Sequence, residues 1–188
     1  MLYNIYVNVL SHMNVIQTKI EKSARVADIV LKIARILGWI LIGMLILLIG
    51  AVVVIYGIAG SEAFNEWILP DGSSFPGIFA VFSIESLAYM GFIMGILIVA
   101  GKIFSGIRKT MLPFTKDNAQ HLKTIALLIA LISVIPGLIE MIGAAIIGVS
   151  MEMFTISIEG LVLAFVVYSL AHIFEYGLEL QEQADETL

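Results

Sequence analysis

The sequence predicts an all-α integral membrane protein, a four-helix bundle whose two termini both lie in the cytoplasm. Of its 188 residues, 60% are hydrophobic and 13% are Asp, Glu, Lys or Arg, about half the charged share of a soluble domain. Four apolar segments are long enough to cross a bilayer, and all the basic residues lie in two clusters outside them. This composition excludes a disordered chain, a basic nucleic-acid-binding domain and an ordinary soluble enzyme.

Four uninterrupted apolar runs define the predicted membrane spans. Each forms a helix of about 30 Å or more at ~1.5 Å per residue, which matches the hydrocarbon core of a bilayer. The first run contains no charged residue, whereas each of the other three contains at least one glutamate. We place the spans at residues 36–58, 77–101, 124–150 and 154–176, all within a transmembrane domain of residues 25–176.

Residues 1–24 form an N-terminal segment ahead of this domain. Residues 1–12 are uncharged and half apolar, and Met13 precedes a charged amphipathic stretch. Two interpretations stay open. Either Met13 is the natural start and part of the segment is non-native, or residues 1–12 form a real surface segment.

The orientation follows from the positions of the ten basic residues. Five precede the first span and five lie between the second and third spans. The charged residues of the loop at residues 59–76 are all acidic. By the positive-inside rule, the N-terminus and the linker at residues 102–123 face the cytoplasm. The expected location is the cytoplasmic (inner) cell membrane, which the chain crosses several times. Four spans then return the acidic tail, residues 177–188, to the same side. The basic residues are Lys19, Lys22, Arg25, Lys32, Arg35, Lys102, Arg108, Lys109, Lys116 and Lys123.

Small residues along the spans predict close helix packing. Gly43, Gly50 and Gly57 recur every seven residues, and Gly91 and Gly95 form a GxxxG pattern. Helices in lipid associate through such small residues because their backbones can approach closely. We expect a compact bundle within one chain, with a homodimer as the alternative.

Two breaks in helical pattern are expected. Pro136 should kink the third helix, because its ring clashes with the carbonyl four residues earlier. In the linker, Pro113 cannot continue the preceding helix, and Thr115 is a suitable N-cap for the next one, with Asp117 in its first turn.

Three acids within the spans are the first candidates for a functional site. Glu85, Glu140 and Glu159 all fall in the predicted outer half, where the chain has no Lys or Arg. An ionisable group inside a bilayer is costly and is by default a functional hypothesis. The acids either form a pocket for a ligand, a proton or an ion, or they are protonated and hydrogen-bonded to a neighbouring helix.

A polar stripe lies at the inner end of the fourth span. Ser169, His172, Tyr176 and Glu179 are spaced as one helix face, with Glu175 beside them. Histidine and carboxylates at helical spacing can bind a metal, but the stripe lacks the Glu-x-x-His order of helical-bundle metal sites. We therefore predict no metal and interpret the stripe as a structural contact that docks the helix end on the linker.

The acidic tail and the basic linker have complementary charge. They suit a contact with each other or with a partner, and a solvated tail is the third interpretation. The candidate partner-binding residues are Lys102, Arg108, Lys109, Pro113, Phe114, Glu179 and Glu182.

No catalytic or cofactor-binding motif is present. The chain has no cysteine, and we find no HExxH, GxSxG, P-loop or glycine-rich dinucleotide turn. The sequence therefore predicts a protein that is not an enzyme and uses no cofactor.

Two segments, "LPFTKDNAQHLKTIALLI" and "LVLAFVVYSLAHIFEYGLELQEQADETL", resemble a known family. It consists of small bacterial four-pass membrane proteins catalogued only as a domain of unknown function, and the resemblance covers roughly residues 25–188. Pro113 and Phe114 match its Pro-Phe turn before the third helix. Members are often encoded beside a small helix-turn-helix regulator, which implies a membrane-bound regulatory pair. The matching ending comprises Phe174, Gly177, Leu178, Gln181, Asp185, Glu186, Thr187 and Leu188.

We therefore expect a non-enzymatic membrane sensor or regulator that holds or releases a small helix-turn-helix protein. The expected partners are the lipid bilayer, this regulator and, as an alternative, a second copy of the chain, with no direct binding of nucleic acid. A small ion- or proton-coupled transporter or channel is the first alternative function. A structural or immunity-type membrane protein is the second.

Overall fold

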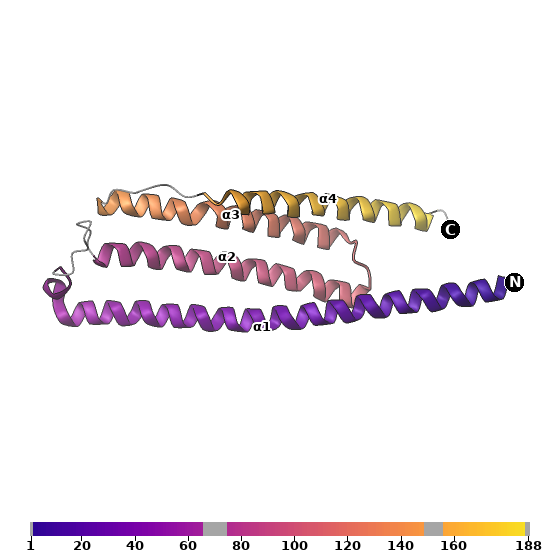
Figure 1. Ribbon diagram of the computed structural model, residues 1–188, viewed down its shortest axis with the longest axis horizontal. Helices are drawn as coiled ribbons and strands as arrows, with labels where there is room; N and C mark the ends of the chain where they lie inside the picture. Colours follow the sequence, from indigo (N-terminus) through magenta and orange to yellow (C-terminus); the bar gives the residue numbers. More distant parts are fainter. Residues whose placement is uncertain (1, 66–74, 149–155, 187–188) are drawn as a thin grey trace.

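The described part of the chain folds into four long α-helices in a computed structural model (Figure 1). Each is long and apolar enough to cross a membrane, so the predicted all-α class with four long apolar helices is confirmed. The structure describes residues 2–65, 75–148 and 156–186, and side chains within 17–58, 76–148 and 156–186 except Asp185. The helices are α1 (Leu2–Asn65), α2 (Phe75–Thr110), α3 (Lys116–Ile147) and α4 (Ile158–Glu186).

Several sequence predictions fall outside the described residues. They are the side chains of residues 1–12, the acids of the loop at residues 59–76, the adjoining ends of the third and fourth spans (149–150 and 154–155), and Thr187 and Leu188.

Both chain termini lie at the same end of the molecule, which we call the terminal end (Figure 1). The α2–α3 linker also lies toward this end, and the end of α1, the start of α2 and the end of α3 lie at the opposite end. Helix α1 has 64 residues and therefore spans roughly 96 Å at 1.5 Å per residue. It is far longer than a bilayer is thick, and its N-terminal part extends past the other helices toward the terminal end.

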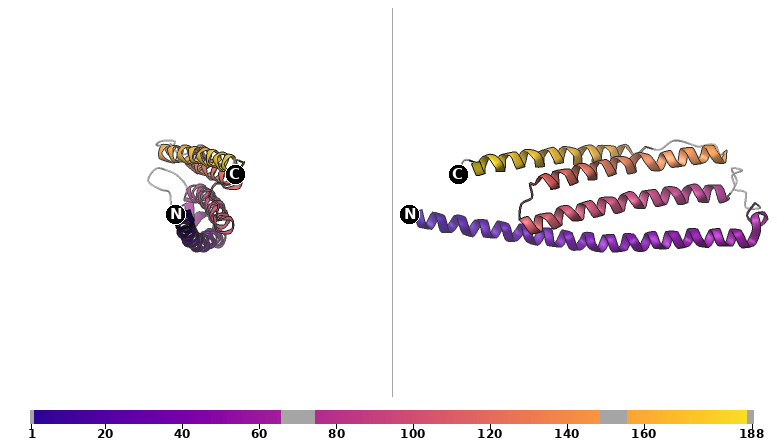
Figure 2. Two further views of the ribbon diagram at one scale, coloured as in Figure 1. Left: turned by 90° about the vertical axis from the view of Figure 1, so that its right-hand side faces the viewer. Right: turned by 180° about the vertical axis from the view of Figure 1, so that it is seen from behind.

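The helices pack in chain order, α1 on α2, α2 on α3 and α3 on α4. In the described part of the chain, α1 touches neither α3 nor α4, so the bundle is an open row (Figure 2). The edge helices present apolar side chains outward, and Leu47 on α1 and Phe165 on α4 are 75% and 71% exposed. Such an apolar exterior suits a lipid environment and would promote aggregation in water.

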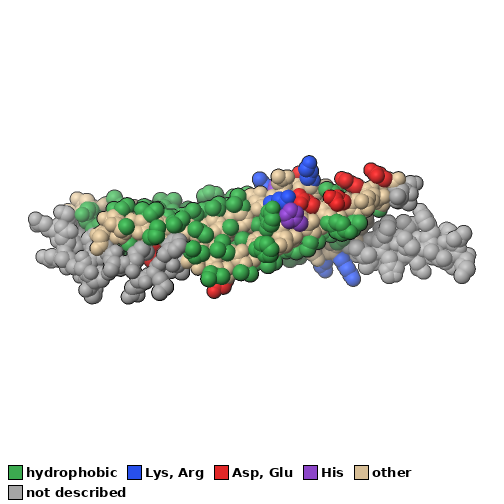
Figure 3. Space-filling model, turned by 90° about the horizontal axis from the view of Figure 1, so that it is seen from above, with side chains coloured by type: hydrophobic (Ala, Val, Ile, Leu, Met, Phe, Trp, Pro, Cys, Tyr) green, Lys and Arg blue, Asp and Glu red, His purple; other side chains and the backbone are tan. Residues whose placement is uncertain are grey.

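Apolar side chains cover the middle of the face formed by α3 and α4, and most charged ones gather toward the terminal end (Figure 3). This distribution agrees with the separation of charge along the sequence. Among the described side chains, the charged groups are thus concentrated at the terminal end.

The α2–α3 linker has the predicted helix boundary. Thr115 is the N-cap of α3, and its hydroxyl accepts a hydrogen bond from the Asn118 N–H at 3.2 Å. The Asn118 side-chain amide donates to the Pro113 carbonyl at 2.9 Å, which closes the turn. Met111, with φ at 57°, adopts the left-handed conformation just after α2 ends, where the chain must change direction.

Helix α3 continues through Pro136 to Ile147 and ends at Gly148, whose φ of 78° provides a left-handed cap. One turn before the proline, the Ser133 carbonyl accepts a hydrogen bond from the Ser157 N–H at 3.1 Å. This bond ties the start of α4 to the middle of α3. As a result, α4 runs beside only part of α3.

The glycines at helix contacts match the predicted ones only in part, since Gly95 meets a neighbouring helix but four others do not. A Cβ atom added at Gly43, Gly50, Gly57 or Gly91 would lie more than 4 Å from any described atom of a neighbouring helix. The expectation that these four glycines pack against another helix of the chain is therefore wrong. Close approach occurs where a glycine faces a side chain of a neighbouring helix. Examples are Gly38 with Met94, Gly95 with Leu128, Gly143 with Val81, and Gly160 with Ser133.

Candidate functional site

Two of the three predicted acids come together between α2 and α3. Glu85 lies near the start of α2 and Glu140 near the end of α3, and these antiparallel helices pack side by side. Gly143 contacts Val81 about one turn from each acid, which places Glu85 and Glu140 at the same level of the two helices. Glu85 is half-buried and Glu140 is exposed. Among the described side chains, neither acid forms an ion pair with Lys or Arg.

Glu159 occupies a different environment, in the first turn of α4. The Ser157 hydroxyl accepts a hydrogen bond from the Gly160 N–H at 3.1 Å and lies 3.5 Å from a Glu159 carboxylate oxygen. A carboxylate in a first turn is stabilised by the helix dipole and the free N–H groups there. Glu159 therefore has a structural explanation that the other two acids lack.

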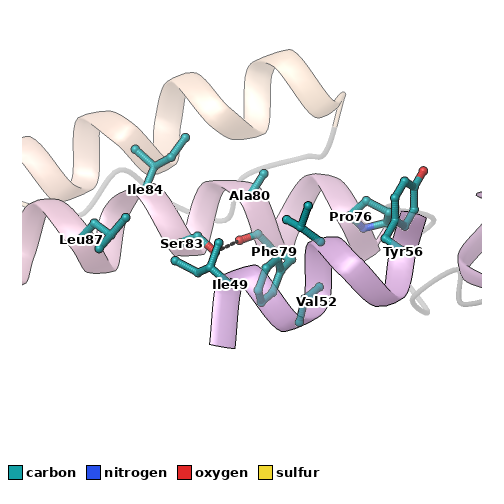
Figure 4. Close-up of a pocket in the computed structure, with 10 residues that line it drawn as sticks. Ile49, Val52, Tyr56, Pro76, Phe79, Ala80, Ser83, Ile84 and Leu87 are labelled. Carbon is teal, nitrogen blue, oxygen red and sulfur yellow. Dashed lines mark hydrogen bonds between the residues drawn. The ribbon is translucent and has the colours of Figure 1, made fainter. Parts of the chain in front are cut away.

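An apolar groove of about 340 Å³ lies between α1 and α2 toward the opposite end (Figure 4). The Ser83 hydroxyl lies near the centre of the groove. It donates a hydrogen bond to the Phe79 carbonyl at 2.6 Å, so it already has a hydrogen-bond partner. Sequence reasoning missed this groove, because an apolar groove in an apolar helix pair has no distinctive residue type. It is lined by Ile49, Val52, Val53, Tyr56, Pro76, Phe79, Ala80, Ser83, Ile84 and Leu87.

At the terminal end, Asp28 of α1 is the centre of an ionic cluster. One of its carboxylate oxygens lies 3.0 Å from Lys32 Nζ and 3.1 Å from Arg108 Nη1 of α2. The Asp28 side chain is only 4% exposed. Sequence reasoning did not single out Asp28, although its spacing of four residues from Lys32 is the usual one for a helical ion pair.

Three predicted partner-binding residues make contacts within the chain instead. Arg108 pairs with Asp28, and the Pro113 carbonyl accepts the hydrogen bond from Asn118. The Phe114 ring meets Phe174 of α4 edge-on, with ring centroids 5.1 Å apart. It also lies against Gly177, where a side chain would collide with it. Phe114 therefore fastens the linker to α4.

The other four partner-binding candidates are exposed, namely Lys102, Lys109, Glu179 and Glu182. No ion pair among the described side chains includes any of them. The expected ionic contact between the acidic tail and the basic linker residues is thus not formed by the described part of the tail.

Glu175, which lies beside the predicted polar stripe, joins α4 to α3, whereas His172, Tyr176 and Glu179 of the stripe itself are exposed. One carboxylate oxygen of Glu175 lies 2.6 Å from Lys123 Nζ and the other 3.1 Å from His172 Nδ1. His172 also packs edge-on against Tyr168. Ser169 donates to a carbonyl of its own helix, Tyr176 is exposed, and the described residues contain no cluster suited to a metal ion.

We expect loss of the Lys123–Glu175 pair to lower the thermal stability of the protein modestly. Lys123→Met removes an ion pair whose side chains are about a third exposed, so the effect should shrink as salt rises. Thermal unfolding in detergent at low and high salt measures it. Lys116→Met, which removes an exposed lysine outside the described ion pairs, is the control. A variant as stable as the parent at low salt would contradict the prediction.

Comparison with known proteins adds one finding. A family model described as "Protein of unknown function (DUF2975)" matches residues 71–188, a range that contains α2, α3 and α4. No curated protein and no solved structure matches the chain. The matched residues include Glu85, Glu140 and the linker, whereas α1 with Asp28 lies before them.

Proposed function

The chain belongs to the DUF2975 family of proteins of unknown function, and on this premise we propose that it is a non-enzymatic membrane sensor and regulator. In this proposal it lies in the cytoplasmic membrane of a bacterium with the terminal end inside, as the placement of its basic residues favours. Glu85 and Glu140 receive the signal. The terminal end holds or releases a small helix-turn-helix protein.

The observation that carries the proposal is the pair of acids at the α2–α3 contact. When both carboxylates are ionised they repel each other across the two helices. A shared proton, a bound cation or a cationic ligand removes the repulsion and allows closer packing there. The signal therefore interacts differently with two packings of the same helices, which is the requirement for a population shift.

The distribution of ion pairs explains how such a shift reaches the terminal end. Asp28 and Arg108 join α1 to α2, whereas Lys123 and Glu175 join α3 to α4. No ion pair among the described side chains crosses from α2 to α3. Ion pairs thus join α1 to α2 and α3 to α4, and these two helix pairs pack against each other at the interface where the acids lie.

Movement at that interface would change the distance between the α1–α2 helix pair and the α3–α4 helix pair at the terminal end. Exposed Lys102 and Lys109 belong to one pair, and exposed Glu179 and Glu182 belong to the other. A partner that contacts both charged groups would bind one spacing better than the other. The open row of described helices encloses no lumen, which favours regulation over a single-chain channel.

The test measures directly the distance between the α1–α2 helix pair and the α3–α4 helix pair. The chain has no cysteine, so spin labels at Val30→Cys on α1 and Leu180→Cys on α4, both exposed positions, report a single distance. In lipid nanodiscs we expect this distance to change as the pH falls. The double variant Glu85→Gln with Glu140→Gln should show the low-pH distance at every pH, because glutamine resembles a protonated acid.

Glu159→Gln is the matched control and should respond to pH like the parent, since Glu159 lies in the first turn of α4 and not at the α2–α3 interface. A double variant that still responds, or a parent that does not, would refute sensing by these acids. Affinity purification from native membranes tests the regulatory part. Recovery of a small helix-turn-helix protein supports it, whereas recovery of a toxin or a transporter supports an immunity or structural role.

A further inference from the structure

A second cavity lies between α1 and α2 at the terminal end. Its volume is about 420 Å³, within the range of roughly 300–1,000 Å³ that is usual for small-molecule sites. Unlike the apolar groove, it is bounded mainly by charged side chains. Those that matter here are Asp28, Lys32 and Arg35 of α1 and Lys102 and Lys109 of α2, together with Gly101.

The cavity has an excess of positive charge. Four of its lining side chains are cationic and one, Asp28, is anionic. Asp28 is already paired with Lys32 and with Arg108. Lys102 and Lys109 belong to no ion pair among the described side chains. An anion in this cavity would therefore meet cations that lack a partner within the described chain.

Gly101 gives the cavity its shape on the α2 side. The Arg35 guanidinium lies so close that a Cβ on Gly101 would be 3.1–3.4 Å from its atoms. Arg35 Nε donates to the Leu31 carbonyl of the same helix at 3.3 Å. This bond fixes the side chain where its guanidinium lies against Gly101 of α2. Arg35 is thus positioned by its own helix and by the absence of a side chain opposite.

The cavity lies at the boundary of the apolar runs. Lys32 and Arg35 immediately precede the run at residues 36–58, and Lys102 immediately follows the run at residues 77–101. In a bilayer this is the level of the lipid headgroups, and basic pockets between helices at this level bind anionic headgroups. A soluble phosphate compound would not require this placement.

We propose that this cavity binds the phosphate of an anionic lipid headgroup. The lipid phosphate contacts Lys102 and Lys109 of α2 and Arg35 of α1, so the bound lipid bridges the two helices. The acyl chains then extend along the apolar surface beside the cavity. This site is separate from the acid pair, and the proposal does not depend on a sensory function.

The test measures lipid binding to the full purified chain by native mass spectrometry. Phosphatidylglycerol is added to protein in detergent, and phosphatidylcholine serves as the zwitterionic comparison. Lys102→Ala with Lys109→Ala should weaken phosphatidylglycerol binding about 30-fold, from roughly tenfold per 1.4 kcal/mol and about 1 kcal/mol per basic residue. Lys19→Ala with Lys22→Ala removes equal charge from exposed sites outside the cavity and should have little effect.

A charge-conserving variant separates the site from general attraction of anions. Gly101→Val keeps every cation but takes the space of the Arg35 guanidinium, and it should also weaken binding of phosphatidylglycerol. Thermal unfolding confirms that each variant is folded. Equal loss in both double variants, or equal binding of phosphatidylcholine, would overturn the proposal. Displacement of the lipid by millimolar inorganic phosphate would overturn the lipid assignment in favour of a soluble phosphate compound.

Discussion

Replacing Gly143 by valine is expected to separate α2 from α3 and to lower the free energy of unfolding by about 1–3 kcal/mol. The side chain of Val81 on α2 already occupies the space where a Cβ on Gly143 would lie. Because Val81 is β-branched, its side chain has few alternative rotamers and cannot easily move aside. The helices themselves must move, at the interface that also holds Glu85 and Glu140.

Thermal unfolding in detergent measures this effect, and Gly50→Val is the matched control. Gly50 has no described neighbour within 4 Å of the added Cβ, so the same substitution there should leave the melting temperature nearly unchanged. If both variants melt alike, the α2–α3 contact at Gly143 is not as close as described. If Gly50→Val alone destabilises, α1 packs through its glycine face against another chain.

Replacing Asp28 by asparagine is expected to loosen α1, because this helix contacts only α2 within the described residues. The carboxylate is almost fully shielded from solvent and pairs with cations on both helices. Without its charge, Lys32 and Arg108 lose their shared partner and repel each other. Removing one member of a shielded ion pair generally costs more than the pair contributed, since the remaining charges stay behind.

Hydrogen exchange of α1 backbone amides measures this loosening, and faster exchange around residue 28 is the expected result. Glu21→Gln is the control, since it breaks an exposed ion pair with Arg25 inside α1 alone. A double-mutant cycle with Arg108→Gln isolates the contact between the helices. Additive effects of Asp28→Asn and Arg108→Gln would show that the two side chains do not act together.

The candidate site was only partly predictable from sequence. Glu85 and Glu140 were recognisable because a carboxyl group in an apolar run is conspicuous, and the antiparallel order of spans places them at one level. Glu159 has the same residue type but begins a helix, which changes its environment completely. Phe114 was recognised as part of a motif, yet its contact is with Phe174 in the same chain.

The sequence by itself determined the class of the protein, its four apolar helices and the boundary of α3 at Thr115. These depend on the length and composition of single segments and on local hydrogen bonds, which a linear reading contains. Only the tertiary structure decided the order of packing, the glycines that meet a neighbour, the apolar groove and the role of Asp28. The physical reason is that lipid tails and helix neighbours are equally apolar, so no hydrophobic pattern distinguishes a packed helix face from one that faces lipid.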